Sequence, residues 1–215
     1  MKHGAKFSDE ILDTASRIIG RELQTRVLLD PFAGSGRVHE LADETNCWTF
    51  GIEIEPEFAE MNKLTFVGDS TVDIPKWFEA DTVDVVFSSP CYGNRMADKD
   101  MRSTCAGTYT KWLGRKPSAN SAGGMQWGED YRDLHERVWG QVTLASKRGA
   151  LFVLNTKDFP RNFKRVHVGL WHLNVLTSLG WSWVGHEMVD APGQNFGANQ
   201  GHKVDNEDLF ILRKQ

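Results

Sequence analysis

The amino-acid sequence predicts an α/β protein with a doubly wound, mostly parallel sheet. Two observations support this prediction. Apolar strand segments alternate with helical segments along the amino-terminal half, and the first strand ends in a glycine-containing turn that opens a helix. Such alternation is typical of parallel β-α-β units with right-handed crossovers. In these sheets, ligands bind at the edge formed by the carboxyl ends of the strands.

An amphipathic helix comes first, beginning after a Ser8 cap and ending near Gly20. The alternation then predicts strands at 27–30, 48–54, 66–69 and 83–87, with helices at 36–44, 56–63 and 74–79. Further helices are expected at 129–147 and 166–179, and strands at 150–154, 181–189 and 208–212. The segment 92–127 between the two groups is irregular and polar. Stretches of this length are usually functional or disordered.

The chain has 215 residues, of which 40% are hydrophobic and 25% charged, and its net charge is −4. This length suits one well-buried domain over residues 1–215 and is short for two. No apolar run is long enough to span a membrane, the first residues lack a signal-peptide core, and the three cysteines show no CxxC spacing. We therefore expect a cytoplasmic protein with neither a disulfide framework nor a metal site.

The segment 28–36 reads Leu-Leu-Asp-Pro-Phe-Ala-Gly-Ser-Gly, a strand that ends in an acid and turns into a helix. Gly34 and Gly36 lack the Cβ atoms that would hinder a tight turn and the close approach of a ligand to the backbone. A dinucleotide fingerprint would need a third glycine near Glu40, and a Walker loop would need a following Gly-Lys-Ser/Thr. The sequence has neither.

A second motif, Ser88-Ser89-Pro90-Cys91-Tyr92, follows the apolar strand at 83–87. It places a hydroxyl, a rigid proline and an aromatic ring at the same edge of the sheet as the glycine turn. Together the two segments predict a cofactor turn that faces a substrate clamp.

This pair of motifs resembles the S-adenosylmethionine-dependent DNA methyltransferases of bacterial or phage type that modify exocyclic amines, N6 of adenine or N4 of cytosine. Their cofactor turn reads Asp-Pro-Phe-x-Gly-Ser-Gly, which residues 30–36 match in full. Their catalytic tetrapeptide reads Asp/Asn/Ser-Pro-Pro-Tyr/Phe, which residues 89–92 match except at Cys91. The resemblance implies a Rossmann-like class I methyltransferase fold, a seven-stranded sheet whose last strand runs antiparallel. It also implies S-adenosyl-L-methionine as cofactor and double-stranded DNA as substrate.

Under this resemblance, each strand end offers one group to the cofactor. Glu53 would accept from the ribose hydroxyls, Asp69 from the adenine amine and Asp30 from the methionine ammonium. Glu55 would point to the other face and is expected to cap the following helix. The cofactor-binding residues that we predict are Asp30, Phe32, Ala33, Gly34, Ser35, Gly36, Glu53, Ile54, Asp69, Ser70 and Ser88.

The predicted catalytic residues are Ser89, Pro90 and Tyr92. The lone pair of an exocyclic amine is delocalised into the base and must be directed toward the methyl group. The Ser89 hydroxyl and the Pro90 carbonyl would accept the two amine hydrogens, while Tyr92 stacks on a base flipped out of the helix. No strong base is needed, because a proton can leave after methyl transfer. Serine at the first position tilts the prediction slightly toward cytosine.

One alternative takes Pro90-Cys91 as the Pro-Cys of the cytosine carbon-5 methyltransferases, in which a thiolate adds to the ring. That chemistry also requires a glutamate on the next strand to protonate the ring nitrogen, and the segment 151–158 contains no glutamate. We therefore favour Cys91 as a small residue in place of the second proline. Two other classes stay open: an enzyme acting on RNA or protein amines, and a cofactor-binding regulator without catalysis.

Basic residues gather after the tetrapeptide, although the whole chain is acidic. The segment 93–127 is therefore predicted to be a nucleic-acid-binding insertion, with a solvated surface loop as the alternative. The residues expected at DNA phosphates are Arg95, Arg102, Lys111, Arg115, Lys116, Lys157 and Arg161. The recognition sequence would be read by this insertion, by the loop at 193–206, or with the help of a homodimer or an accessory specificity partner.

Overall fold

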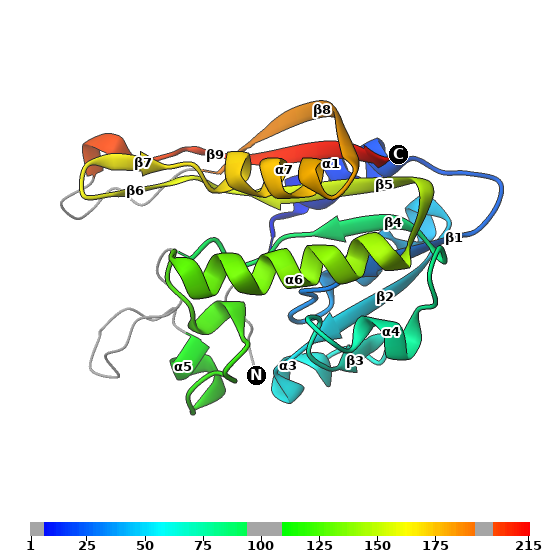
Figure 1. Cartoon of the computed structure of the whole chain (residues 1–215), viewed down its shortest axis with the longest axis horizontal. Coiled ribbons are helices and arrows are strands. Elements are labelled where there is room, and N and C mark those ends of the chain that lie inside the picture. Colours follow the sequence, from blue (N-terminus) through cyan, green and yellow to red (C-terminus); the bar gives the residue numbers. More distant parts are fainter. Residues whose placement is uncertain (1–6, 94–108, 192–199) are drawn as a thin grey trace.

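The computed structural model describes residues 7–93, 109–191 and 200–215, which form a seven-stranded sheet covered by helices (Figure 1). The strand order is β3-β2-β1-β4-β5-β9-β8. Strand β9 runs antiparallel to both β5 and β8, while the other neighbouring pairs are parallel. The predicted doubly wound sheet with an antiparallel last strand is therefore confirmed. The strands are β1 (Arg26–Asp30), β2 (Cys47–Glu53), β3 (Thr65–Val67), β4 (Val83–Ser88), β5 (Ser146–Thr156), β8 (Trp181–Asp190) and β9 (Asn206–Lys214).

Helices cover both faces of the sheet, because neighbouring residues of each strand point to opposite sides and both sides are apolar. Leu29 and Phe152 belong to a core shared with α6 and α7, whereas Leu28 and Val153 belong to a second core shared with α1. The helices are α1 (Asp9–Ile19), α2 (Ala42–Thr45), α3 (Pro56–Ala59), α4 (Ile74–Trp77), α5 (Tyr109–Leu113), α6 (Glu129–Ala145) and α7 (Val168–Ser178), and the 3₁₀ turns are η1 (Arg37–Leu41), η2 (Ala122–Gly124) and η3 (Gln200–His202). Within the described ranges, no helix is long and apolar enough to cross a membrane.

Several expected boundaries are wrong. The helix expected at 36–44 is the 3₁₀ turn η1 followed by α2, which stops at Thr45 because Asn46 takes a left-handed conformation with φ 53°. Strand β5 is longer than expected, because Asn155 and Thr156 are polar yet pair with Leu209 and Asp208 of β9. Both polar residues are buried, at the carboxyl end of the strand.

The sequence analysis missed a two-stranded hairpin formed by β6 (Phe159–Arg161) and β7 (Lys164–Val166). Its two loop residues, Asn162 and Phe163, have φ of 51° and 61°. Tight hairpins of this kind usually carry Asn-Gly, because glycine adopts positive φ without strain. Because Phe163 stands where glycine is usual, the sequence lacks the signal that would have predicted this hairpin.

Candidate functional site

The carboxyl ends of β1, β2, β3 and β4 meet at one edge of the sheet. Asp30 ends β1, Glu53 ends β2 and Ser88 ends β4. Two hydrogen bonds join these ends: Ser88 Oγ donates to Asp30 Oδ1 at 2.9 Å, and the Gly34 N–H donates to Glu53 Oε2 at 2.9 Å. The structure therefore brings together groups that were predicted from separate segments of the sequence.

The turn after β1 requires its glycines. Gly34 and Gly36 have φ of 54° and 79°, which side-chain-bearing residues rarely adopt. A Cβ on Gly36 would also lie only 2.7 Å from the Cβ of Asn62. The Ala33 N–H donates to Ile52 O at 3.0 Å, which ties the turn to β2.

The other predicted cofactor residues lie around this turn. They are Ala33, which is buried, and Phe32, Ser35 and Ile54, which are half-buried. Phe32 stacks on His135 of α6 with ring centroids 5.0 Å apart. Ser70 Oγ donates to Pro31 O at 2.7 Å, so the segment after β3 is fastened to the turn as well.

Asp30 is fully buried and only half of its carboxylate is satisfied. Oδ1 accepts from the Phe32 N–H at 3.0 Å and from Ser88, whereas Oδ2 has no hydrogen-bond partner among the described residues. Burial raises the pKa of this carboxyl to about 7. A buried acceptor without a partner costs free energy, so this atom suits a cationic or hydrogen-bond-donating ligand.

Glu53 is also buried, and burial raises the pKa of its carboxyl to about 7. The Gly34 and Glu55 N–H groups each donate to one of its oxygens at 2.9 Å, which lowers the pKa in part. Each carboxylate oxygen has a second lone pair, so Glu53 retains acceptor capacity for two ligand hydroxyls.

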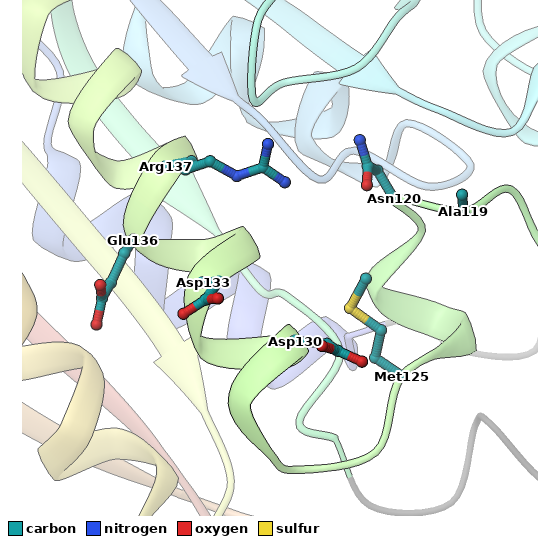
Figure 2. Close-up of a pocket in the computed structure, with 7 residues that line it drawn as sticks. All are labelled: Ala119, Asn120, Met125, Asp130, Asp133, Glu136 and Arg137. Carbon is teal, nitrogen blue, oxygen red and sulfur yellow. The ribbon is translucent and has the colours of Figure 1, made fainter.

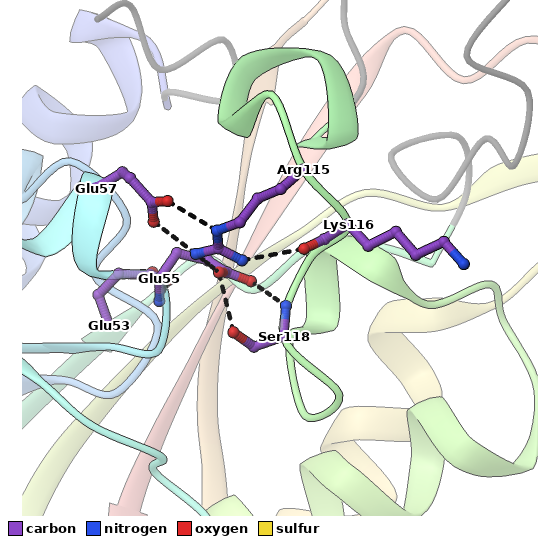
Figure 3. A network of polar contacts seen from close by, with 6 residues as sticks. All are labelled: Glu53, Glu55, Glu57, Arg115, Lys116 and Ser118. Atoms are coloured by element: carbon purple, nitrogen blue, oxygen red, sulfur yellow. Dashed lines mark hydrogen bonds and ion pairs between the residues drawn. The ribbon is translucent and has the colours of Figure 1, made fainter.

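Glu55 does not cap helix α3, contrary to expectation, because α3 has no side-chain cap. Its buried carboxylate instead accepts from the Ser118 N–H at 2.7 Å, the Ser118 hydroxyl at 3.1 Å and Arg115 Nη2 at 2.8 Å (Figure 3). Arg115 also pairs with Glu57 at 2.6 Å. Arg115, expected at a DNA phosphate, thus has two carboxylate partners within the protein.

Asp69, the residue expected at adenine, follows β3 and is held by its neighbours. Oδ1 accepts from the Thr71 N–H at 2.9 Å, and Oδ2 accepts from Asn120 Nδ2 at 2.6 Å. Since Ser118 contacts Glu55 and Asn120 contacts Asp69, the segment from Arg115 to Asn120 lies across the ends of β2 and β3.

A pocket of ≈ 470 Å³ adjoins this segment (Figure 2). Its lining residues come from the segment before α6 and from α6 itself: Ala119, Asn120, Met125, Asp130, Asp133, Glu136 and Arg137. Because Asn120 both lines the pocket and bonds Asp69, the pocket borders the predicted adenine end of the site. No cluster of metal-ligating side chains occurs in the described part of the chain.

The tetrapeptide at residues 89–92, which we predicted to be catalytic, belongs to a polar cluster that the sequence analysis did not predict. Ser89 Oγ lies 3.2 Å from Tyr92 Oη, and Asn155 Nδ2 lies 3.0 Å from Ser89 Oγ and 3.1 Å from Tyr92 Oη. Tyr92 Oη donates to Glu207 Oε2 at 3.0 Å, and Asn155 Nδ2 donates to the same oxygen at 2.7 Å. The one signal for Asn155 in the sequence is its position, directly after the apolar run of β5.

Cys91 is the departure of the tetrapeptide from the family pattern, and its thiol is buried against Tyr109. Its Sγ donates to Tyr109 Oη at 3.3 Å, and burial raises the pKa of the thiol to about 11. The thiolate is the nucleophilic form, and burial disfavours it.

A chain of hydrogen bonds runs from α6 and α7 to the backbone of Cys91. The Trp139 indole can only donate, and it donates to His172 Nδ1 at 2.9 Å. His172 Nε2 therefore carries the ring proton and donates to Tyr131 Oη at 3.1 Å, and Tyr131 donates to Cys91 O at 2.7 Å. Burial lowers the pKa of His172 well below its ordinary value, which keeps the ring neutral as this order requires.

Of the remaining basic residues expected at DNA, Arg95 and Arg102 lie outside the described residues. Lys111 and Lys116 are exposed, on α5 and just after it. Lys157 donates to Ala191 O.

Arg161 lies on the hairpin strand β6. It donates to Trp127 O at 3.0 Å and to Gln126 Oε1 at 2.7 Å. These contacts connect the hairpin to the segment that precedes α6.

Neither a protein-family model nor a curated protein matches the chain. Solved structures do match, and they show the fold of the S-adenosylmethionine-dependent methyltransferases. A geranyl diphosphate methyltransferase solved in complex with S-adenosylmethionine gives a TM-score of 0.60 at 10% identity, over 96% of this chain and 85% of that one. A precorrin-6y C5,15-methyltransferase from Geobacter metallireducens gives 0.59 at 13% identity, over 100% and 92%.

TrmN from Thermus thermophilus gives a TM-score of 0.52 at 12% identity. The match covers 96% of this chain and 48% of TrmN, so the chain spans about half the length of that protein. At such identities the likeness shows the fold alone.

Tyr131→Phe should lower the free energy of unfolding by about 1–3 kcal/mol, because it leaves Cys91 O and the His172 Nε2–H without their partner. Urea unfolding measures this. Thr177→Val, which removes a hydroxyl bonded to Leu173 O of its own helix, should cost less than about 0.5 kcal/mol. Equal costs for the two variants would contradict the proposed hydrogen-bond order.

Proposed function

We propose that this chain is an S-adenosylmethionine-dependent methyltransferase that methylates an exocyclic amine, cytosine N4 or adenine N6, of a base flipped out of double-stranded DNA. The observation that carries the proposal is the contact between Ser88 and Asp30. Asp30 belongs to the cofactor turn, and Ser88 directly precedes the catalytic Ser89. A methyl donor held at Asp30 and an amine held at Ser89 would therefore be neighbours.

The residues at the sheet edge fit this cofactor. The unpartnered Oδ2 of Asp30 would accept from the methionine ammonium, and Glu53 would accept from the ribose hydroxyls. Asp69 would accept from the adenine amine, in competition with Asn120. When bound, the cofactor supplies an electrophilic methyl group on a positively charged sulfur.

The tetrapeptide supports amine chemistry. Ser89 Oγ and the Pro90 carbonyl are the acceptors proposed for the two amine hydrogens, which would turn the nitrogen lone pair toward the methyl group. The half-buried Tyr92 offers a ring on which a flipped base would stack. Carbon-5 chemistry through Cys91 is disfavoured because its thiol stays protonated at neutral pH.

An amine in RNA or in a protein is the second candidate class of substrate, since the same acceptors would serve it. Favouring DNA are the resemblance of both motifs to the DNA amino-methyltransferases and the exposed Lys111 and Lys116 near the tetrapeptide. For a non-catalytic cofactor-binding regulator, the acceptors at Ser89 and Pro90 would have no use.

The proposal is tested by incubating the protein with methyl-labelled S-adenosylmethionine and, in parallel, with double-stranded DNA, single-stranded DNA and RNA of the same sequence. Digestion to nucleosides and chromatography then identify the labelled species. Label in N4-methyl-2′-deoxycytidine or N6-methyl-2′-deoxyadenosine from the DNA duplex is expected. Label only in 5-methyl-2′-deoxycytidine, only in RNA nucleosides, or in none would refute the proposal as stated.

Affinity for S-adenosylmethionine should rise with pH. Burial raises the pKa values of Asp30 and Glu53 to about 7, so both carboxyls are largely protonated at pH 6. The ammonium group of the cofactor would bind the ionised form of Asp30. Between about pH 6 and about pH 7.5 the ionised fraction of Asp30 rises from about 0.1 to about 0.75, so the association constant should increase about eightfold, with proton release on binding. Calorimetry in two buffers of different ionisation enthalpy measures both. Asp30→Asn should bind more weakly and with a smaller pH slope, and a pH-independent parent would contradict the assignment.

Cys91→Ser should keep activity within about tenfold, a change of about 1.4 kcal/mol in the activation free energy, because the residue is a spacer beside Pro90. The measurement is the methylation rate under the conditions above. Loss of turnover in Cys91→Ser, together with a covalent adduct of the parent with fluorinated cytosine in DNA, would instead identify Cys91 as the nucleophile.

The lysines after the tetrapeptide should govern the salt dependence of DNA binding. If Lys111 and Lys116 each neutralise one phosphate, replacing both by alanine should lower the log–log salt slope by about 2. Arg115→Ala is the matched comparison: Arg115 already pairs with Glu55 and Glu57, so its loss should leave the slope nearly unchanged. A slope that falls only in Arg115→Ala would reverse these roles.

A further inference from the structure

Asn155 and Glu207 have no role in the function proposed above, yet both contact its catalytic serine or tyrosine. Asn155 ends the apolar run of β5 and is fully buried, and Glu207 lies near the start of β9 and is half-buried. A carboxylate so near the end of β4 is notable because the tetrapeptide itself has serine, not an acid, at its first position.

The directions of the hydrogen bonds in this cluster follow from Glu207. An ionised carboxylate can only accept, so both Asn155 Nδ2 and Tyr92 Oη must donate to it, at 2.7 and 3.0 Å. This fixes the orientation of the amide, since a flipped Asn155 would place its oxygen against the carboxylate. In this orientation Asn155 Oδ1 is buried with no hydrogen-bond partner among the described residues, which costs free energy.

The hydroxyl of Tyr92 has one hydrogen, which it donates to Glu207 in a hydrogen bond. Burial and the neighbouring carboxylate both raise the pKa of Tyr92 well above its ordinary value, so the phenol keeps this hydrogen. At the 3.2 Å contact between the two hydroxyls, Ser89 must therefore donate and Tyr92 accept. Ser89 Oγ also accepts from Asn155 at 3.0 Å, which leaves it one lone pair and no hydrogen to offer.

We propose that Glu207, held by Asn155, is the positioning residue that turns the Ser89 hydroxyl into an acceptor for the substrate amine, acting through Tyr92. This inference rests on the proposed function. Hydrogen bonds in series polarise one another, and a chain that ends in a carboxylate increases the negative charge on its first oxygen. Glu207 thereby supplies from β9 the charge that an acid would supply at the first position of the tetrapeptide.

The same chain gives the amine proton a destination. As the amine nitrogen bonds to the methyl carbon, the carbon–sulfur bond breaks, its electron pair stays on sulfur, and the positive charge passes to nitrogen. One N–H proton then moves to Ser89 Oγ, the serine proton moves to Tyr92 and the tyrosine proton moves to Glu207. Glu207 ends as a carboxylic acid, which loses its proton to water, and the other groups regain their starting forms.

Three variants test this role: Glu207→Gln, which removes the charge, Tyr92→Phe, which breaks the chain but keeps the ring, and the two combined. Each single change should lower kcat about 10- to 100-fold, with the cofactor Kd and the KM for DNA little changed. Both cut the same chain, so the double variant should be no slower than the slower single one. Glu187→Gln, a carboxylate of neighbouring β8 paired with Arg17, is the control and should keep the parental kcat.

A second readout needs neither substrate nor cofactor. In ¹⁵N-labelled protein, the side-chain amide of Asn155, assigned by its loss in Asn155→Leu, should shift markedly in Glu207→Gln and not in Glu187→Gln. An unmoved Asn155 signal in Glu207→Gln, an undiminished kcat in that variant, or multiplying losses in the double variant would each overturn the inference while leaving the proposed function standing. A parent that methylates no exocyclic amine would overturn the proposed function and this inference with it.

Discussion

The hydrogen bond between Ser88 and Asp30 couples the two halves of the site, because it joins the end of β4 to the end of β1 inside a fully buried environment. Parallel pairing of β1 with β4 sets the register, with Leu28 opposite Val85 and Leu29 opposite Val86. Continuing that register places Asp30 opposite Phe87, one residue before Ser88, so the two side chains are close at the strand ends, and the glycine turn and the tetrapeptide begin at the following residues. A slip of one residue would move the end of β4 along β1 by about 3.3 Å, so the distance between the glycine turn and Ser89 depends on this pairing.

Burying acids at this edge has an electrostatic consequence. Asp30, Glu53 and Glu55 are all buried near one another, and within the described residues Arg115 pairs with Glu55. Arg115 thereby anchors the segment up to Asn120 over the ends of β2 and β3, whereas the pKa values of Asp30 and Glu53 are raised to about 7. A site with this charge pattern suits a ligand that brings its own cation and hydroxyl donors. Part of the binding free energy is then the relief of two poorly solvated carboxyls.

The sequence predicts the sheet well because its apolar strands have a regular period and its glycine turn has few alternatives. It also predicts that Asp30, Glu53 and Asp69 lie at one edge of the sheet, since each ends or follows a strand, and their role as cofactor ligands stays a prediction. It does not predict Glu207 in the site, because the contact with Tyr92 spans 115 positions of the chain and depends on β9 running antiparallel beside β5. The sequence also does not predict the two carboxylate partners of Arg115, because the ion pairs join residues about 60 positions apart in the chain.

Two hydrogen-bond chains, one neutral and one charged, reach the tetrapeptide at different residues. The chain from Trp139 through His172 and Tyr131 is neutral throughout and ends on the backbone oxygen of Cys91, so it fixes where the tetrapeptide lies. The chain that ends at Glu207 is charged, and in the proposed role it fixes the polarity of Ser89. A neutral chain is suited to position because its geometry does not change with the charge of the reacting nitrogen. A charged chain is suited to the reacting atom because its effect grows as that nitrogen becomes positive, which is the condition for stabilising the transition state more than the bound substrate.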